Sequence, residues 1–262
     1  MRALHTAATG MMAQELNVQV ISNNIANMRT TGYKRQRAEF QDLLYEHVNR
    51  VGTQTSDQGN ILPAGIELGS GVKTVGTPRL MSQGSLAQTG KDYDIAIRGE
   101  GFYKILMPDG RTAYTRDGSF ELDAQGRLVT AQGNVVQPGI TIPQDATSVS
   151  INSEGEVSVT QPGSTTPSTV GQLELALFIN KAGLQAIGDN LFLETPASGT
   201  PQNGTAGTDG YGTLLQGSLE QANVEAVSEI SDLIAAQRAY EMNAKVITAA
   251  DQMLSATSNL MR

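Results

Sequence analysis

The 262-residue sequence contains no cysteine and no tryptophan. Without cysteine, the chain can form no disulfide, use no thiolate and build no zinc site on sulfur ligands. Only two histidines are present, His5 and His47, and neither is accompanied in the sequence by the serine or carboxylate neighbours of a catalytic constellation. Aromatic residues make up only 5 % of the chain beside 28 glycines, which favours short strands and turns over large enzymatic layers.

Positive charge is also scarce, with 18 basic against 26 acidic residues and a formal net charge of -8. This excess opposes the phosphate neutralisation that nucleic-acid binding requires, so we expect no nucleic-acid partner. No apolar run approaches the roughly 18 residues of a membrane-spanning helix, and we expect no direct membrane insertion. Polar residues interrupt the first 14 positions, so we also expect no cleaved signal peptide.

The first segment with a regular pattern is the N-terminus, where apolar residues recur every seven positions. One column consists of Leu4, Met11, Val18 and Ile25, and a second, three residues on, of Ala7, Gln14, Ile21 and Met28. This spacing predicts a helix with a coiled-coil seam, about 25 residues long and ending near Met28. The polar residues and the glycine of the following Thr30–Gly32 turn favour that end.

The C-terminus carries a longer apolar column of the same kind. It consists of Leu219, Ala226, Leu233, Tyr240, Ile247, Leu254 and Met261, and Ile230 widens it. Because neither glycine nor proline occurs from 218 to 262, we expect a helix of about 40 residues, capped by either Ser218 or Asn223. Glu229 lies beside the column in the pattern, so we expect a charge change there to be mild.

The two terminal segments carry opposite charge, with a net +4 over residues 1–37 and a net -3 over residues 219–262. Matching seams and charges predict that the two helices pack on each other. Taken alone, such columns are consistent either with a core between the two helices of one chain or with an interface between chains in a polymer.

Between the helices, apolar residues alternate with polar ones, and turn sequences typical of hairpins separate the alternating runs. Strand-like runs at 103–107, 112–116 and 119–122 are separated by Pro-Asp-Gly and Asp-Gly turns. Alternation at 149–151 and 157–159 adds another hairpin, and we expect a buried strand at 173–179. We therefore predict an α+β fold with four parts: an N-terminal assembly helix (1–35), an extended arm (36–72), a β-rich central domain (73–216) and a C-terminal assembly helix (217–262).

Motifs that could carry chemistry are weak. Asp92 and Asp94 form a D-x-D pair, but turn or edge solvation explains them better than a cation site. The segment 117–123 lacks the ligand spacing of a calcium loop, and Gly99-Glu100-Gly101 lacks the rest of a nucleotide fingerprint. We expect no catalytic residue, no metal site and no cofactor, and hence no enzyme.

Both ends of the chain resemble the paired signatures of the flagellar rod, hook and hook-associated proteins. The resemblance rests on Asn24–Asn27 with Thr30–Lys34 at one end, and on Gln221–Glu225, Ala235–Glu241 and Asp251–Leu254 at the other. The segments 63–72, 92–103 and 108–118 are similar to the distal rod subunits within that family. The signature residues are Asn24, Ala26, Asn27, Thr30, Gly32, Tyr33, Lys34, Gln237, Arg238, Ala239 and Tyr240.

The resemblance implies a structural subunit of the basal-body distal rod, a helical tube that transmits motor torque to the hook. It implies export by the flagellar type III apparatus to a rod that spans the periplasm. The implied partners are further copies of the chain, proximal rod subunits, the hook protein and ring proteins of the outer envelope. The alternatives are a proximal rod subunit of similar length or, from another class, a periplasmic or cell-surface β-domain hydrolase with helical oligomerisation ends.

The resemblance also turns the apolar columns into a predicted assembly interface. Its residues are Leu4, Met11, Val18, Ile21, Ile25, Met28, Ala226, Ile230, Leu233, Tyr240, Ile247, Leu254 and Met261.

Overall fold

The computed structural model describes residues 2–49, 64–163, 166–208 and 210–260. Long terminal helices flank a β-rich middle, so the predicted α+β class is confirmed. The chain divides into unit 1 (residues 1–26, 36–78 and 225–262) and unit 2 (residues 27–35 and 79–224). Met261 of the predicted interface and residues 50–63 of the predicted arm lie outside the described residues.

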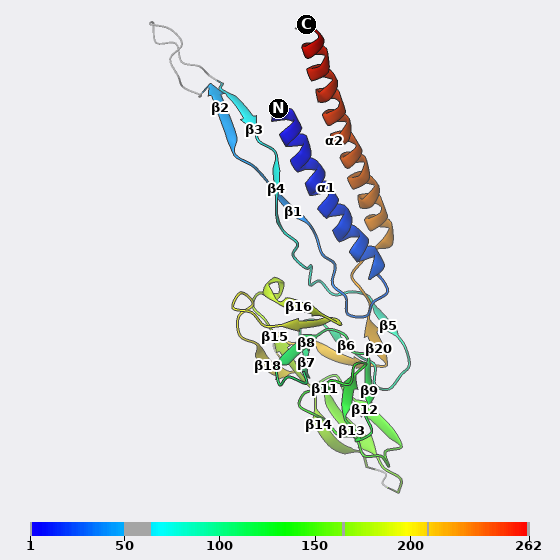
Figure 1. The fold of residues 1–262 in the computed structure, drawn as a ribbon. Helices are drawn as coiled ribbons and strands as arrows, with labels where there is room; N and C mark the ends of the chain where they lie inside the picture. Colours follow the sequence, from blue (N-terminus) through cyan, green and yellow to red (C-terminus); the bar gives the residue numbers. More distant parts are fainter. Residues whose placement is uncertain (1, 50–63, 164–165, 209, 261–262) are drawn as a thin grey trace. The chain divides into compact units, whose positions relative to one another are not determined.

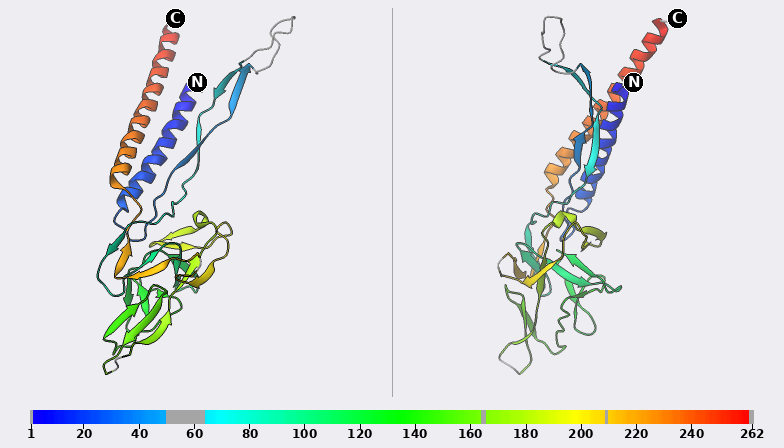
Figure 2. Two further views of the ribbon diagram at one scale, coloured as in Figure 1. Left: turned by 180° about the vertical axis from the view of Figure 1, so that it is seen from behind. Right: turned by 90° about the vertical axis from the view of Figure 1, so that its left-hand side faces the viewer.

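Unit 1 is built on two helices that lie side by side in all three views (Figures 1 and 2). Helix α1 spans Arg2–Ala26 and helix α2 spans Ala226–Leu260. Helix α1 ends two residues before the expected position, because Asn27 starts a tight turn. In that turn the Thr30 backbone N–H donates to the Asn27 carbonyl at 3.0 Å, and the Thr30 hydroxyl donates to the Asn27 side chain at 3.2 Å.

Both expected caps of the C-terminal helix are wrong. Residues Ser218–Glu220 form a strand, β20, rather than the first helical turn. The Asn223 side chain is engaged in unit 2, where it accepts from the Arg35 backbone N–H at 2.7 Å and donates to the Leu80 carbonyl at 2.8 Å. Helix α2 instead follows Glu225, whose carbonyl accepts the Glu229 backbone N–H at 3.0 Å.

Beside the helices, the described part of unit 1 contains an antiparallel ribbon (Figure 1). Strand β1 (Glu39–Asp42) pairs with β4 (Val72–Gly76), and β2 (Tyr45–Asn49) pairs with β3 (Ile66–Gly69). Helix α1 contacts β4, and the Val72 N–H donates to the Thr9 hydroxyl at 3.4 Å. All residues of β2 and β3 are exposed, and a lone two-stranded ribbon of this kind has little stability of its own.

Unit 2 consists of antiparallel sheets. In its described part the largest sheet has nine strands, in the order β16-β17-β8-β7-β11-β10-β9, with β15 joining β7 to β18. A three-stranded sheet β12-β13-β14 and the pairs β19-β6 and β20-β5 complete the unit. The bounds are β5 Leu86–Gln88, β6 Ile95–Arg98, β7 Phe102–Leu106, β8 Thr112–Thr115, β9 Phe120–Leu122, β10 Leu128–Thr130, β11 Val135–Val136, β12 Ser148–Ile151, β13 Glu156–Thr160, β14 Ser168–Gln172, β15 Glu174–Leu177, the 3-10 turn Lys181–Gly183, β16 Gln185–Gly188, β17 Leu191–Leu193, β18 Gln202–Thr205, β19 Thr213–Gln216 and β20 Ser218–Glu220.

The core of unit 2 follows from the period-two pattern. Tyr103 and Ile105 on β7 are fully buried together with Phe120 of β9 and Leu175 of β15. The Tyr103 ring meets Phe120 edge-on, and its hydroxyl donates to the Ile95 carbonyl at 2.7 Å. Burial of Tyr103 raises the pKa of its phenol well above the ordinary value, so the group stays a neutral donor. Among the described residues, no helix is long and apolar enough to cross a membrane.

Candidate assembly site

On α2 the centre of the helix pair is lined by small and polar side chains. On α1 the buried residues are Ala7, Ala13, Val20, Ile21 and Asn24, and on α2 a central column consists of Glu229, Ala236, Asn243 and Ala250. Gly10 leaves room on α1 for the Asn243 side chain, because a Cβ at position 10 would lie 2.9 Å from the Asn243 amide nitrogen. The intramolecular contact here is therefore made by a polar side chain of α2 against a residue of α1 that has no side chain.

Asn24 is the polar anchor of this pair. Its amide donates to the Gln36 carbonyl at 2.8 Å, and its side-chain oxygen accepts the Gln36 N–H at 3.0 Å. The same amide donates to the Glu229 carboxylate at 3.1 Å, although the two residues are 205 positions apart. Glu229 is completely buried, so the expectation that a charge change at Glu229 would be mild is wrong.

Most residues of the predicted assembly interface lie beside the central column. On α2, Leu233, Tyr240, Ile247 and Leu254 each follow a central residue by four positions, and therefore form an adjacent stripe. Leu233 and Ile247 are half-buried, whereas Tyr240, Leu254 and Ile230 are exposed by 44, 50 and 49 %. Leu4, Met11, Val18, Ile25 and Ala226 are half-buried, Ile21 is buried, and Met28 lies past the end of α1.

A groove opens between the two helices on this stripe. It has a volume of about 460 Å³ and is lined by Val18 and Tyr240, with Glu15, Gln19, Gln237 and Glu241 around them. The two helices of one chain therefore leave apolar surface of both exposed at the same place. Such surface is typical of a contact with another protein.

A buried ionic cluster connects both ends of the chain within unit 2. The Lys34 ammonium binds one oxygen of the Glu220 carboxylate at 2.5 Å, and the Arg116 guanidinium lies 3.1 Å from the other. The three side chains are exposed by at most 3 %. The Gly84 N–H also donates to Glu220 at 2.9 Å, and Arg116 donates to the Gly99 and Gly101 carbonyls, both at 2.8 Å.

Burial is the main electrostatic influence on Lys34. Desolvation lowers the pKa of its ammonium below the ordinary value, Glu220 opposes that shift, and the nearby Arg116 reinforces it. One carboxylate thus balances two buried cations, which makes Glu220 the residue on which the cluster depends.

Gly32 allows the N-terminal segment to reach this cluster. Its N–H donates to the Glu220 carbonyl at 2.8 Å, its φ is +67°, and a Cβ would lie only 2.6 Å from the Asp117 backbone nitrogen. We predict that Gly32→Ala lowers the free energy of unfolding of unit 2 by about 3 kcal/mol, from the left-handed backbone and the clash together. Thermal denaturation of the full chain measures this.

The matched control for that substitution is Gly133→Ala. Gly133 also has a positive φ, +85°, but a Cβ there would meet nothing within 4 Å. Gly133→Ala should lower the free energy of unfolding by only roughly 1–2 kcal/mol, the cost of placing alanine in a left-handed backbone conformation. Equal losses at the two glycines would contradict the close approach at Gly32.

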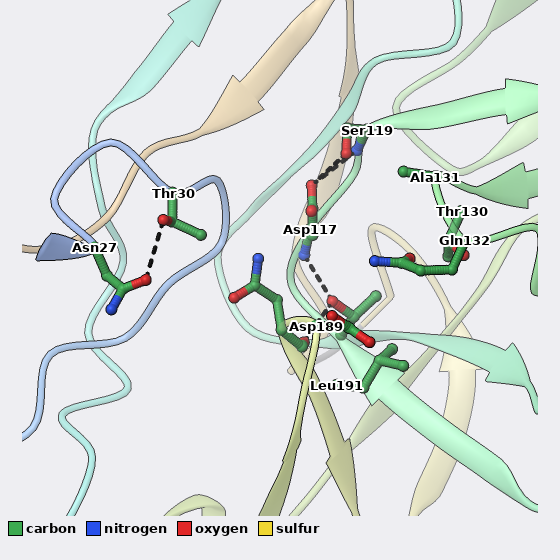
Figure 3. A pocket seen from close by; sticks show the side chains of 11 residues that line it. Asn27, Thr30, Asp117, Ser119, Thr130, Ala131, Gln132, Asp189 and Leu191 are labelled. Atoms are coloured by element: carbon green, nitrogen blue, oxygen red, sulfur yellow. Dashed lines mark hydrogen bonds between the residues drawn. The ribbon is translucent and has the colours of Figure 1, made fainter. Parts of the chain in front are cut away.

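A polar pocket of about 320 Å³ lies next to the same N-terminal segment in unit 2 (Figure 3). Asn27 and Thr30 line it on one side, and Asp117, Ser119 and Asp189 on the other. The Asp117 carboxylate accepts both the N–H and the hydroxyl of Ser119, at 3.0 and 2.8 Å. These bonds stabilise the turn after β8, the role expected of an Asp-Gly turn.

The other chemical candidates are separated in the structure. The Asp94 carboxylate is buried and accepts the Thr89 hydroxyl at 2.6 Å, whereas Asp92 is exposed. His5 is exposed on α1, and His47 faces Glu67 at 3.1 Å across the exposed β2-β3 pair. Within the described residues, no group of three or more histidine or acidic side chains could hold a metal ion.

The structure divides the family signature into two groups. Asn24, Gly32, Tyr33 and Lys34 are buried in contacts of the chain with itself, while Asn27 and Thr30 form the turn after α1. Gln237, Arg238 and Tyr240 are exposed, Ala26 is exposed at the end of α1, and Ala239 is half-buried. Sequence reasoning did not find Glu220 as the partner of Lys34, or Arg116 as the second cation of the cluster, because Lys34 and Glu220 lie 186 positions apart.

A β-rich unit combined with long terminal helices defines an α+β protein. Three family models match the chain: "Flagella basal body rod protein" at residues 4–34, "Flagellar hook protein FlgE/F/G D1 domain" at 96–159 and "Flagellar basal body rod FlgEFG protein C-terminal" at 215–260.

Full-length relatives give the same result. The chain is 58 % identical to the flagellar basal-body rod protein FlgG of Caulobacter vibrioides over 99 % of both chains. It is 49 % identical to that of Borreliella burgdorferi, over 100 % of this chain and 99 % of the relative, and 38 % identical to that of Bacillus subtilis over 100 % of both. The chain belongs to the FlgG family of flagellar basal-body rod proteins.

Proposed function

We propose that the chain is a structural subunit of the distal rod that polymerises into a helical tube and transmits motor torque to the hook. The observation that carries this proposal is the stripe of large apolar side chains on α2, half-buried or exposed, beside a central column of small and polar residues that the chain already buries. A heterologous contact through such a stripe yields a helical filament when its rotation does not close into a ring.

The partners follow from this proposal. Further copies of the chain occupy the lateral contacts. Proximal rod subunits and the hook protein bind at the two ends, and ring proteins of the outer envelope surround the outer surface. The flagellar type III apparatus exports the chain to the rod, which spans the periplasm. The relatives do not favour the proximal rod subunit or the hydrolase as alternatives.

The test is polymerisation of the purified full chain, imaged by cryo-electron microscopy. We expect straight tubes in which α1 and α2 of neighbouring copies are in contact, and restored motility when the gene is returned to a strain lacking its distal rod subunit. Hydrolysis of peptidoglycan by the purified chain, without any polymer, would support the hydrolase instead.

A further inference from the structure

A cluster of buried aromatic side chains in unit 2 is in contact with two arginines. The guanidinium of Arg116 lies 5.9 Å from the centre of the Phe102 ring, and that of Arg79 lies 5.6 Å from the centre of the Phe192 ring. Both distances are within the range of a cation–π contact. The rings of the cluster are each exposed by at most 4 % and belong to Phe102, Tyr114, Phe178 and Phe192.

The two arginines differ in their polar partners. Arg116 faces the Glu220 carboxylate at 3.1 Å and donates to two backbone carbonyls. Arg79 is half-buried, yet its guanidinium makes no hydrogen bond or ion pair within the part of the chain that the structure describes. Three further cations that are buried or half-buried each bind a carboxylate of the same chain, namely Lys34, Lys104 and Lys181.

The backbone next to Arg79 is held in place by hydrogen bonds. The Leu80 N–H donates to the Arg35 carbonyl at 2.8 Å, and the Leu80 carbonyl accepts the Asn223 amide at 2.8 Å. Burial lowers the pKa of the Arg79 guanidinium, an effect that Tyr33 opposes, but an arginine stays charged near neutral pH. Its planar fork of N–H donors suits a carboxylate, which it can bind through two parallel hydrogen bonds.

We infer that Arg79 binds an acidic side chain of a second copy of the chain in the polymer. The chain carries 26 acidic against 18 basic residues, so a second copy offers carboxylates in excess. On unit 2, Asp92, Glu154 and Glu194 are exposed and make no ion pair among the described residues. Charge complementarity between copies therefore favours a carboxylate as the partner.

The position of Arg79 also lowers the cost of forming such a pair. Burying a charge in an interface is unfavourable because the charge loses its water. The chain itself already removes part of the water from Arg79 and packs it against Phe192, so less of this cost falls on assembly. The inference rests on the proposed function and adds a contact made by unit 2 to those proposed for the helices.

Carbodiimide cross-linking identifies the partner directly. It joins an ammonium to a carboxylate only when the two are in contact, and in Arg79→Lys the introduced ammonium can still lie over Phe192. This variant is polymerised with an excess of isotope-labelled unmodified chain, cross-linked and digested. We expect an unlabelled peptide containing position 79 joined to a labelled acidic peptide, and none in mixtures that were not polymerised. Cross-links from position 79 only within one chain, or none in polymers, would overturn the inference.

Substitution measures what the contact contributes. Arg79→Gln should raise the critical concentration of polymerisation about tenfold, the effect of losing one charge-assisted pair. The matched control is Arg98→Gln, which removes an exposed arginine of β6 in the same unit and should leave the critical concentration unchanged. Arg79→Glu should polymerise poorly alone and be rescued in mixtures with a chain whose cross-linked acid is replaced by arginine.

A purely structural role of Arg79 predicts a different result. If Arg79 only stabilises the aromatic cluster, Arg79→Gln lowers the melting temperature of the monomer but leaves the critical concentration of the folded chain unchanged. That outcome would overturn the inference and leave the proposed function intact. Failure of the unmodified chain to polymerise would overturn both.

Discussion

Replacing Leu233 by lysine should abolish polymerisation while leaving the thermal unfolding of unit 2 unchanged. Burial of a leucine contributes about 1.5–3 kcal/mol, and an unpaired ammonium in its place adds a desolvation penalty. Because every 1.4 kcal/mol is a factor of ten, the critical concentration should rise at least about 100-fold. Sedimentation of polymer and calorimetry of the monomer measure the two effects, and Ile247→Lys should behave alike.

Two further variants separate assembly from the subunit's own helix contact. Leu254 is half exposed in the single chain, so Leu254→Lys should impair polymerisation without affecting the monomer. Gln252→Lys adds the same charge on the exposed polar face and should polymerise normally. If Leu233→Lys still forms tubes, or if its monomer loses the unit 2 transition, the apolar stripe beside the central column of α2 is not the assembly surface.

Replacing Glu220 by glutamine should be among the most destabilising single changes in unit 2. It removes the negative charge that balances two buried cations, a loss of about 3–5 kcal/mol in free energy of unfolding. For a unit of this size the melting temperature should fall by roughly 10 °C, measured by calorimetry of the full chain. Glu121→Gln, which breaks the exposed pair with Lys91, is the control and should leave the melting temperature unchanged.

A double-mutant cycle tests the cause of that loss. Lys34→Met alone should destabilise unit 2, but the same change added to Glu220→Gln should stabilise it, because one uncompensated cation is removed. A change of sign of this kind is specific to charge balance. If the two losses simply add, the cluster contributes through packing rather than through its charges.

Much of the fold could be predicted from local pattern. The heptad columns predicted both helices, and the Pro-Asp-Gly turn predicted the hairpin of β7 and β8. These features depend on residues within a few positions of one another, where backbone propensity and side-chain period act directly. The hairpin expected at the Asp-Gly turn is wrong, because β9 pairs with β10 and not with β8. The start of α2 could not be predicted, because Asn223 has the chemistry of a cap and only the rest of unit 2 directs it elsewhere.

The sequence by itself determined the helical ends, the β-rich middle, the shortage of groups for catalysis and the family. The tertiary structure alone decided which face of each helix the chain uses for itself. In the repeat of seven, the columns of Glu229 and of Leu233 are equally compatible with a contact, and hydrophobicity favours Leu233. In the structure Glu229, Ala236 and Ala250 are the buried residues of α2, and Asn243 takes the space that Gly10 leaves, whereas Tyr240 and Leu254 stay exposed for other contacts.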